Sequence, residues 1–312
     1  MDRRRGVGAG AGRRDRQSRR RDRRHQEGRL ALGDVRADPS HCVAPGWRRP
    51  HLFRTAFSSP DATTGYSAAC RASSEVNVEV CLFLIGHGAP GSEAGSTELS
   101  RFEAASQDIE GLRRFAIHVP AQADDCDPLS KTDASTCPRC VLQWYFDDLE
   151  LLERTLQPGR AIHDLVDGSS NNGLTFTHQV MAVRTFATPN PSGPGTRAER
   201  CTYLVSYEGE AQDFNAWLTH YLLHHPPLMA QLPGIRELEI YTRLDYRSGL
   251  RIRRATAMQR NKVVFDDPAA LAAALASPVR ASMKQDFNAF PPYSGATLHF
   301  PMRSIYGNLK PK

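Results

Sequence analysis

Three closely spaced histidines are the side chains of this sequence best suited to chemistry. His220, His224 and His225 lie within one apolar, aromatic-rich segment. An imidazole titrates near neutral pH, so it can remove a proton from a phenol, an acidic carbon or a hydroperoxide and later return it. His225 is our first candidate for this role. The alternative is a structural histidine that interacts with the last carbonyls and the dipole of a helix end.

Metal binding is the other chemistry that these histidines suggest. His220 and His224 are four residues apart, so on a helix they share a face and could hold a metal ion. No Glu follows His220, so the HExxH motif is absent, and no third ligand is evident. The single CxxC, Cys137–Cys140, supplies two of the four ligands of a closed zinc site, even with Cys126 nearby. We therefore expect no metal, a packed or solvated histidine pair, and a loop before the next strand at the CxxC.

Aromatic residues precede the histidines at helical spacing. Phe214, Trp217 and Tyr221 stand at positions i, i+3 and i+7, which places them on one face of a helix. Packing in the core is the default interpretation of such a stripe. If a pocket lies between this helix and a sheet, the three side chains would form its apolar wall and contact a small-molecule substrate.

A later strand offers further candidates for substrate contacts. Polar and apolar residues alternate over residues 237–241, and Arg243 follows two positions later. Tyr241, which aligns with His118 in the repeat described below, could present its hydroxyl to a ligand, and Arg243 could hold an anionic oxygen. Alternatively, Tyr241 packs its ring in the core and forms a hydrogen bond nearby.

The elements that must position these residues occur twice along the chain. Periodicity predicts the order strand, helix, strand, strand, helix, strand in each half. The first set covers residues 76–86, 99–112, 113–121, 139–148, 149–156 and 179–189. The second covers residues 201–209, 211–228, 235–245, 255–267, 268–290 and 295–303, with Pro226 and Pro227 expected to end its first helix.

Two landmarks connect the halves. Phe146–Asp148 matches Phe265–Asp267, where Asp is favoured as the cap of the following helix. Gly111 matches Gly234 at a helix-to-strand corner, where glycine can adopt a positive φ. A β-α-β-β-α-β unit leaves one sheet face uncovered, and two such units bury it against each other. We therefore predict an α+β fold in which two ferredoxin-like repeats, 75–188 and 201–306, joined by a linker at 189–200, form a single-chain dimeric α/β barrel.

The second repeat resembles the EthD family. The resemblance is carried by Tyr221 with His225–Leu228, by Leu232–Ile235, by Val264–Asp267 and by the Ala-rich helix that ends at Ala276–Pro278. It is good over about residues 201–300 and weaker over 76–185. The first repeat keeps the order of elements but lacks the His-x-Pro-Leu helix end, so at most one family-like site remains.

The resemblance implies a dimeric α/β barrel, a small hydrophobic, aromatic or ether ligand, and a place in oxidative catabolism. It also matches Asp286 to an acid near the end of the family's second helix, where the carboxylate either orients a histidine or faces solvent. Relatives in the wider superfamily include cofactor-free monooxygenases, cyclases, dehydratases, isomerases and haem enzymes, and the fold alone does not choose among them. We expect an oxidoreductase-type protein with His225, Tyr241 and Asp286 as catalytic residues. A cofactor-independent cyclase, dehydratase or isomerase, or a non-catalytic ligand carrier, is the alternative.

Composition limits the remaining functions. The formal charge is +6, but residues 1–54 hold 16 of the 40 basic and 6 of the 34 acidic residues, so the rest of the chain has 24 − 28 = −4. We expect residues 1–74 to be an Arg-rich disordered extension: upstream sequence that is not native, a tail without a specific role, or a nucleic-acid-binding or targeting arm. Seven cysteines without framework spacing and the lack of a long apolar run favour a cytoplasmic protein. The barrel interpretation leaves either a monomeric pseudo-dimer or a homodimer. Nucleotide, flavin and haem motifs are absent, so we expect no cofactor.

Overall fold

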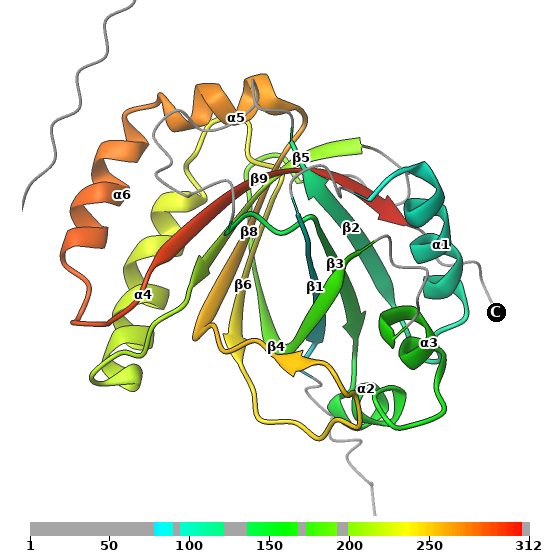
Figure 1. Ribbon diagram of the computed structural model, residues 1–312. Helices are drawn as coiled ribbons and strands as arrows, with labels where there is room; N and C mark the ends of the chain where they lie inside the picture. The colour runs from blue at the N-terminus through cyan, green and yellow to red at the C-terminus, as the bar shows by residue number, and fades with distance from the viewer. Residues whose placement is uncertain (1–77, 90–93, 122–135, 168–172, 192–198, 308–312) are drawn as a thin grey trace, which may run out of the picture. The chain divides into compact units, whose positions relative to one another are not determined.

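Eight antiparallel strands close into a barrel in the computed structural model, which describes residues 78–89, 94–121, 136–167, 173–191 and 199–307 (Figure 1). Among these residues the strand order is β1-β3-β2-β9-β5-β8-β6-β4, and β4 pairs with β1 to complete the circle. The strands are β1 Val80–His87, β2 Arg114–Pro120, β3 Cys140–Phe146, β4 Thr175–Phe186, β5 Glu199–Tyr207, β6 Glu237–Arg243, β8 Gln259–Phe265 and β9 Thr297–Gly307. A two-residue strand, β7 Arg253–Arg254, pairs in parallel with β4.

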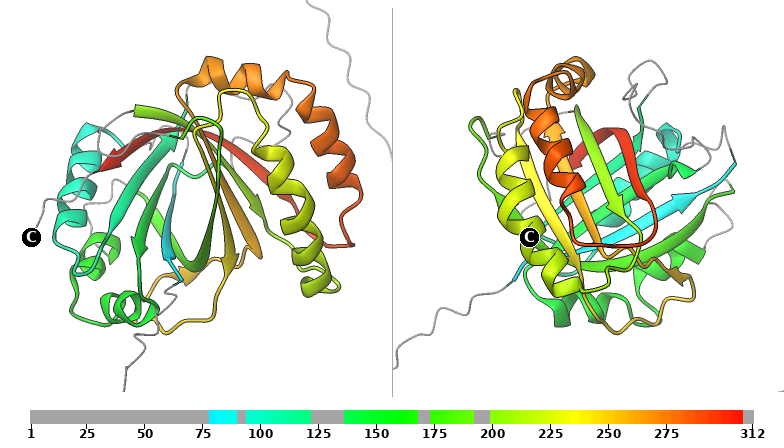
Figure 2. Two further views of the ribbon diagram at one scale, coloured as in Figure 1. Left: turned by 180° about the vertical axis from the view of Figure 1, so that it is seen from behind. Right: turned by 90° about the vertical axis from the view of Figure 1, so that its left-hand side faces the viewer.

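The helices lie outside the barrel in two groups, as both views in Figure 2 show. The first group contains α1 Ser96–Gln107, α2 Leu149–Thr155 and α3 Ala161–Asp167; the second contains α4 Phe214–Met229, α5 Pro268–Leu275 and α6 Val279–Asn288. The predicted α+β class is confirmed, and the predicted elements follow one another in the predicted order, with the helix α3 and the short strand β7 in addition. The predicted helix over 268–290 is interrupted, because α5 ends and α6 begins on either side of Ala276–Pro278.

Local sequence signals determine where several of these elements begin. The carboxylate of Asp148 accepts hydrogen bonds from the first backbone N–H groups of α2, and that of Asp267 accepts one from Ala270 in α5. Gly111 and Gly234 have φ values of 75° and 74°, a left-handed conformation that glycine adopts at little cost. The two landmark pairs therefore have the local structure that the sequence predicts.

The two prolines near the end of α4 behave differently from the prediction. Pro226 and Pro227 do not stop the helix, which continues to Met229. Each proline lacks an N–H donor, so the carbonyls of Leu222 and Leu223, four residues earlier, lose their helical partner, but the fixed φ of proline is itself helical. The carbonyl of Pro226 accepts from the N–H of Ala230 at 2.9 Å, and that of Pro227 accepts from the side chain of Gln231 at 2.9 Å. These bonds complete the last turn of α4 beyond the two prolines.

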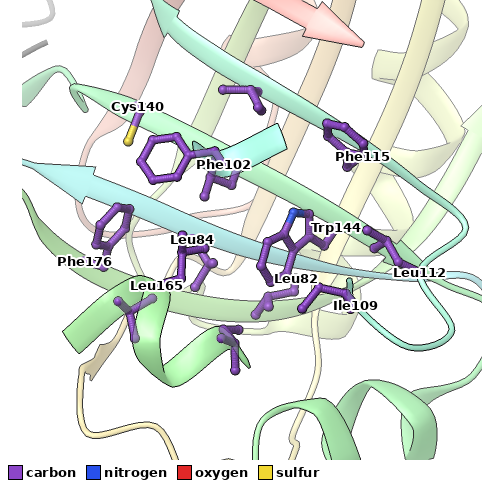
Figure 3. Packing of buried hydrophobic residues seen from close by; sticks show 14 of the residues in the cluster. Leu82, Leu84, Phe102, Ile109, Leu112, Phe115, Cys140, Trp144, Leu165 and Phe176 are labelled. Carbon is purple, nitrogen blue, oxygen red and sulfur yellow. The ribbon is translucent and has the colours of Figure 1, made fainter. Parts of the chain in front are cut away.

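Three apolar clusters fill the fold. One lies between the sheet and the first helix group and is built around Phe102, Trp144 and Phe176 (Figure 3). The second lies between the sheet and α4, α5 and α6 and is rich in aromatic rings. The third fills the barrel interior with side chains from β1, β3, β4, β5, β6 and β9. Successive residues of a strand point to opposite faces, so each strand contributes both to a helix-facing layer and to the interior.

Some predictions lie outside the described residues, namely the extension at 1–74, Cys126, and the middle of the linker, 192–198. Cys140 is the first residue of β3 and is buried in the apolar core, which fits the loop-to-strand interpretation of the CxxC. Over the described ranges, no helix has both the length and the apolar character needed to cross a membrane.

Candidate functional site

His225 and Asp286 form a hydrogen-bonded pair between two neighbouring helices. His225 lies in the last turns of α4 and is 5% exposed; Asp286 lies on α6, which packs beside α4 (Figure 2). The Nδ1 atom of the imidazole is 2.8 Å from Oδ2 of the carboxylate. The structure thus places Asp286 against a histidine, which was one of the two alternatives for this residue.

The second oxygen of the same carboxylate is also bonded. His220, one and a half turns before His225, places Nε2 3.2 Å from Oδ1 of Asp286. His224 is exposed, and its ring centre is 4.6 Å from that of His220. Within the described ranges, no group of three His, Cys, Asp or Glu side chains is placed to hold a metal ion. His220 and His225 thus contact the two oxygens of one carboxylate, that of Asp286.

The proton arrangement of His225 follows from its partners. Burial lowers the pKa of this imidazole, and the hydrogen bond and charge of Asp286 only partly offset the effect. The ring is therefore neutral at pH 7. An ionised carboxylate can only accept a hydrogen bond, so Nδ1 carries the proton and Nε2 carries the lone pair. A neutral ring with a free Nε2 lone pair has the protonation state of a general base.

Aromatic rings surround this histidine. The ring centres of Tyr221 and Phe290 are each 5.2 Å from that of His225. Trp217 stacks on Tyr221 at 5.2 Å and on Phe214 at 6.4 Å, so the predicted aromatic stripe forms one continuous stack along α4. Trp217 and Tyr221 are fully buried and form part of the core between α4 and the sheet.

One polar atom in this stack has no partner. The indole Nε1 of Trp217 is buried and lacks a hydrogen bond to any described residue. A buried donor without an acceptor is costly, and such groups need an explanation in a native structure.

Tyr241 and His118 lie on the other face of the sheet from His225. Tyr241 points into the barrel, where its hydroxyl is 2.7 Å from that of Tyr145 and also donates to Glu239. His118 is fully buried, with Nδ1 2.6 Å from Ser304 and Nε2 2.7 Å from Gln143. Burial, aided by the charge of Lys262, lowers the pKa of His118 to about 3, so it is neutral. Neither side chain is brought together with His225.

Arg243 also lies apart from the histidine pair. Its guanidinium is 2.8 Å from the carboxylate of Glu210 and 4.9 Å from the ring centre of Phe214. It therefore contacts the far end of the aromatic stack, where an anionic group would have to compete with Glu210.

A buried charge network inside the barrel was not predicted. The ammonium group of Lys262, which is fully buried, lies 2.8 Å from Glu239 and 3.3 Å from Glu237. Burial alone would raise the pKa of Glu239, but Lys262 and Arg114 lower it to about 2. The available signal was the charged side chains at alternate positions of two predicted strands, Glu237 and Glu239 in β6 and Arg260 and Lys262 in β8.

The sequence also gave no indication of a cavity at one end of the barrel. This cavity, which we call the barrel-end cavity, has a volume of about 420 Å³. Its apolar lining comes from Phe83, Ile85, Val141, Leu204, Leu298 and Phe300. Its polar lining includes His87, Thr177, Ser206, Glu208, Arg253, Arg254 and Arg260. None of the predicted site residues lines it, because its walls come from seven strands whose pairing is set by the closed barrel.

Comparisons with known proteins give a fold but no family. No family model and no curated protein match this chain. Among solved structures, an anthrone oxidase-like protein aligns with a TM-score of 0.50 and 14% identity, over 74% of this chain and 92% of its own. A protein from Fusobacterium nucleatum named as a candidate monooxygenase aligns with a TM-score of 0.45 and 8% identity, over 74% of this chain and 94% of its own. An EthD family protein from Bacillus halodurans aligns with a TM-score of 0.26 and 19% identity, over 32% of this chain and 95% of its own. The first likeness shows a shared fold and says nothing about the reaction.

Proposed function

We propose that this chain acts on a small hydrophobic or aromatic molecule by proton transfer at His225. The observation that carries the proposal is the 2.8 Å bond from Nδ1 of His225 to Asp286 in a buried, aromatic surrounding. The bond orients the ring and keeps the proton on Nδ1, and burial keeps the ring neutral. Nε2 then takes a proton from the substrate while Asp286 stabilises the charged ring that forms.

The surroundings of His225 favour an aromatic substrate. Phe214 and Phe290, which are partly exposed, are the rings of this aromatic cluster that a ligand could contact, whereas Trp217 and Tyr221 are buried behind them in the core.

We favour an oxidative reaction, in line with the EthD resemblance and with the name of the anthrone oxidase-like neighbour. In this proposal His225 removes a proton from an activated CH₂ group or a phenol, and dioxygen accepts the electrons. For a CH₂ group, one oxygen atom becomes a carbonyl and the other leaves as water with the two hydrogens. A cyclase, dehydratase or isomerase would begin with the same proton transfer, whereas a ligand carrier would need none.

We further propose that the barrel is a fusion of two ferredoxin-like repeats, the second of them EthD-like. The halves meet at two seams, β2 with β9 and β4 with β6. Each seam pairs the second strand of one half with the fourth strand of the other, so exchanging the halves maps one seam onto the other, as in a two-fold dimer. Because the chain closes the barrel by itself, we expect a monomer in light scattering.

The proposed reaction can be tested with anthrone under air, by measuring its loss and its oxidised product with liquid chromatography and mass spectrometry. We expect His225→Gln to lose at least about a hundredfold in rate, the usual contribution of a general base. His224→Gln, an exposed neighbour on the same helix, is the matched control and should keep the rate. Full activity in His225→Gln would overturn the role of this residue.

A second measurement separates proton transfer from oxidation. Under nitrogen in D₂O, exchange of the anthrone CH₂ protons should exceed the rate without protein and should depend on His225. Exchange without oxidation under air would favour the isomerase or cyclase alternative. Binding of anthrone without exchange would favour the carrier.

A further inference from the structure

The barrel-end cavity has the size and lining of a second ligand site. Its volume of about 420 Å³ lies within the usual range of roughly 300–1,000 Å³ for small-molecule pockets. Apolar side chains form its inner wall, among them Phe83, Leu204 and Phe300, which belong to the interior cluster of the barrel. It is on the opposite face of the sheet from His225.

Arg260 brings a buried positive charge to this cavity. Its side chain is 11% exposed, with the guanidinium 5.6 Å from the ring centre of Phe83. One N–H group donates to Ser206 at 2.7 Å, and two donate to Gln179 at 3.3 and 3.4 Å. A guanidinium has five N–H groups, so two of them have no hydrogen-bond acceptor among the described residues.

The charge of Arg260 is only partly balanced. The nearest carboxylate, that of Glu208, is 3.7 Å away and also accepts a hydrogen bond from Ser206. Lys262, two residues along the same strand, has two carboxylates within 3.3 Å. Burial lowers the pKa of Arg260, with Glu208 acting against this effect. A buried cation that lacks full compensation is costly, and a bound anion would relieve that cost.

The rim of the cavity adds more positive charge. Arg253 and Arg254, which form β7, line the cavity and are exposed. Burial, together with the charges of Arg253 and Arg260, lowers the pKa of His87, so this imidazole is neutral and can donate or accept a hydrogen bond. Three arginines and one carboxylate among the charged lining residues leave a net charge of 3 − 1 = +2.

We propose that the barrel-end cavity binds a small amphipathic carboxylate, with its head on Arg260 and its apolar body against Phe83, Leu204 and Phe300. The two N–H groups without acceptors, one on each terminal nitrogen, match the two oxygens of a carboxylate. The cavity then serves as a binding site separate from the proton-transfer site at His225. Arg253 and Arg254 attract the anion and contribute less once it is bound, since exposed charges are screened.

Titration calorimetry of the full chain with 2-naphthoate tests this assignment. We expect 2-naphthoate to bind about tenfold or more tightly than 2-naphthamide, its neutral analogue, because the charge-assisted bonds are lost with the amide. The methyl NMR signals of Ile85 and Leu298 should shift on binding. Equal affinity for the two compounds, or no binding of either, would overturn the proposal.

Variants then locate the head group. Arg260→Met should weaken 2-naphthoate binding about tenfold or more, and the double change Arg253→Gln with Arg254→Gln should weaken it a few-fold and reduce its salt dependence. Arg251→Gln, an exposed neighbour outside the lining, is the matched control. If Arg260→Met does not fold, the comparison of 2-naphthoate with 2-naphthamide and the double variant at Arg253 and Arg254 still test the proposal. Binding that persists in His225→Gln while anthrone turnover is lost would show that the two sites are independent.

Discussion

Replacing Asp286 by Asn should lower the pKa of His225. The carboxylate lies 2.8 Å from Nδ1 and stabilises the protonated ring, whereas burial, the larger influence, destabilises it. Asn keeps an oxygen that can accept the Nδ1 hydrogen bond but removes the negative charge. Only the burial effect then remains in full, so the pKa must move further below the usual 6.5.

The size of this shift follows from the geometry. Two unit charges about 4 Å apart interact by about 4 kcal/mol at an effective dielectric constant of about 20. Opposite charges at such distances change pKa values by about 1 to 3 units, each worth about 1.4 kcal/mol. We therefore expect the pKa of His225 to fall in Asp286→Asn, because its charged form loses stabilisation on the order of 1–4 kcal/mol.

Nitrogen-15 NMR of histidine-labelled protein measures both the pKa and the tautomer without any substrate. Asp245→Asn, which changes an exposed acid elsewhere, should leave the His225 titration unchanged. In the wild type, kcat/KM should be lost as the pH falls through the pKa of His225, and in Asp286→Asn the loss should occur at lower pH. An unchanged or raised pKa, or a proton on Nε2 in the wild type, would refute the proposed base.

Three further predictions concern stability. The folded-state pKa of His118, about 3, is below the unfolded value of about 6.5, so the free energy of unfolding should fall by about 5 kcal/mol as the pH falls from 6.5 towards 3. Urea unfolding at several pH values should show that the free energy of unfolding depends less steeply on pH in His118→Gln. The same pH dependence in the variant and the wild type would contradict this. Lys262→Met should lower the free energy of unfolding by about 3–5 kcal/mol, because Glu239 loses a charge partner in the barrel interior, and adding Glu239→Gln should recover part of that loss. Unchanged stability in Lys262→Met would count against the network. Gly111→Ala should destabilise more than Gly159→Ala in thermal melts, since both have a positive φ but only the former would bring Cβ within 2.0 Å of a leucine side chain; equal losses would show that the contact is harmless.

Local signals in the sequence were sufficient to predict the strands and helices and part of the candidate site. Strand and helix periodicity gave the order of elements in both halves, and the Asp caps and corner glycines gave their boundaries, because these features depend on residues a few positions apart. The aromatic stripe of α4 was visible for the same reason. The end of α4 was predicted at Leu228 and lies at Met229, but the two prolines stand inside the helix instead of stopping it, because the fixed φ of proline is compatible with a helix.

Tertiary structure decided which of the candidates meet. Asp286 is 61 residues from His225 in sequence, and only the packing of α6 on α4 brings the carboxylate to Nδ1 rather than to solvent. Tyr241 and His118 are separated from that pair because the residues of a strand alternate between two faces, and only the closed barrel determines which face is the interior. The barrel-end cavity and the imbalance of charge at Arg260 depend on the register of several strands at once. The sequence alone therefore determined the parts and their order, while long-range strand pairing determined which side chains share a site.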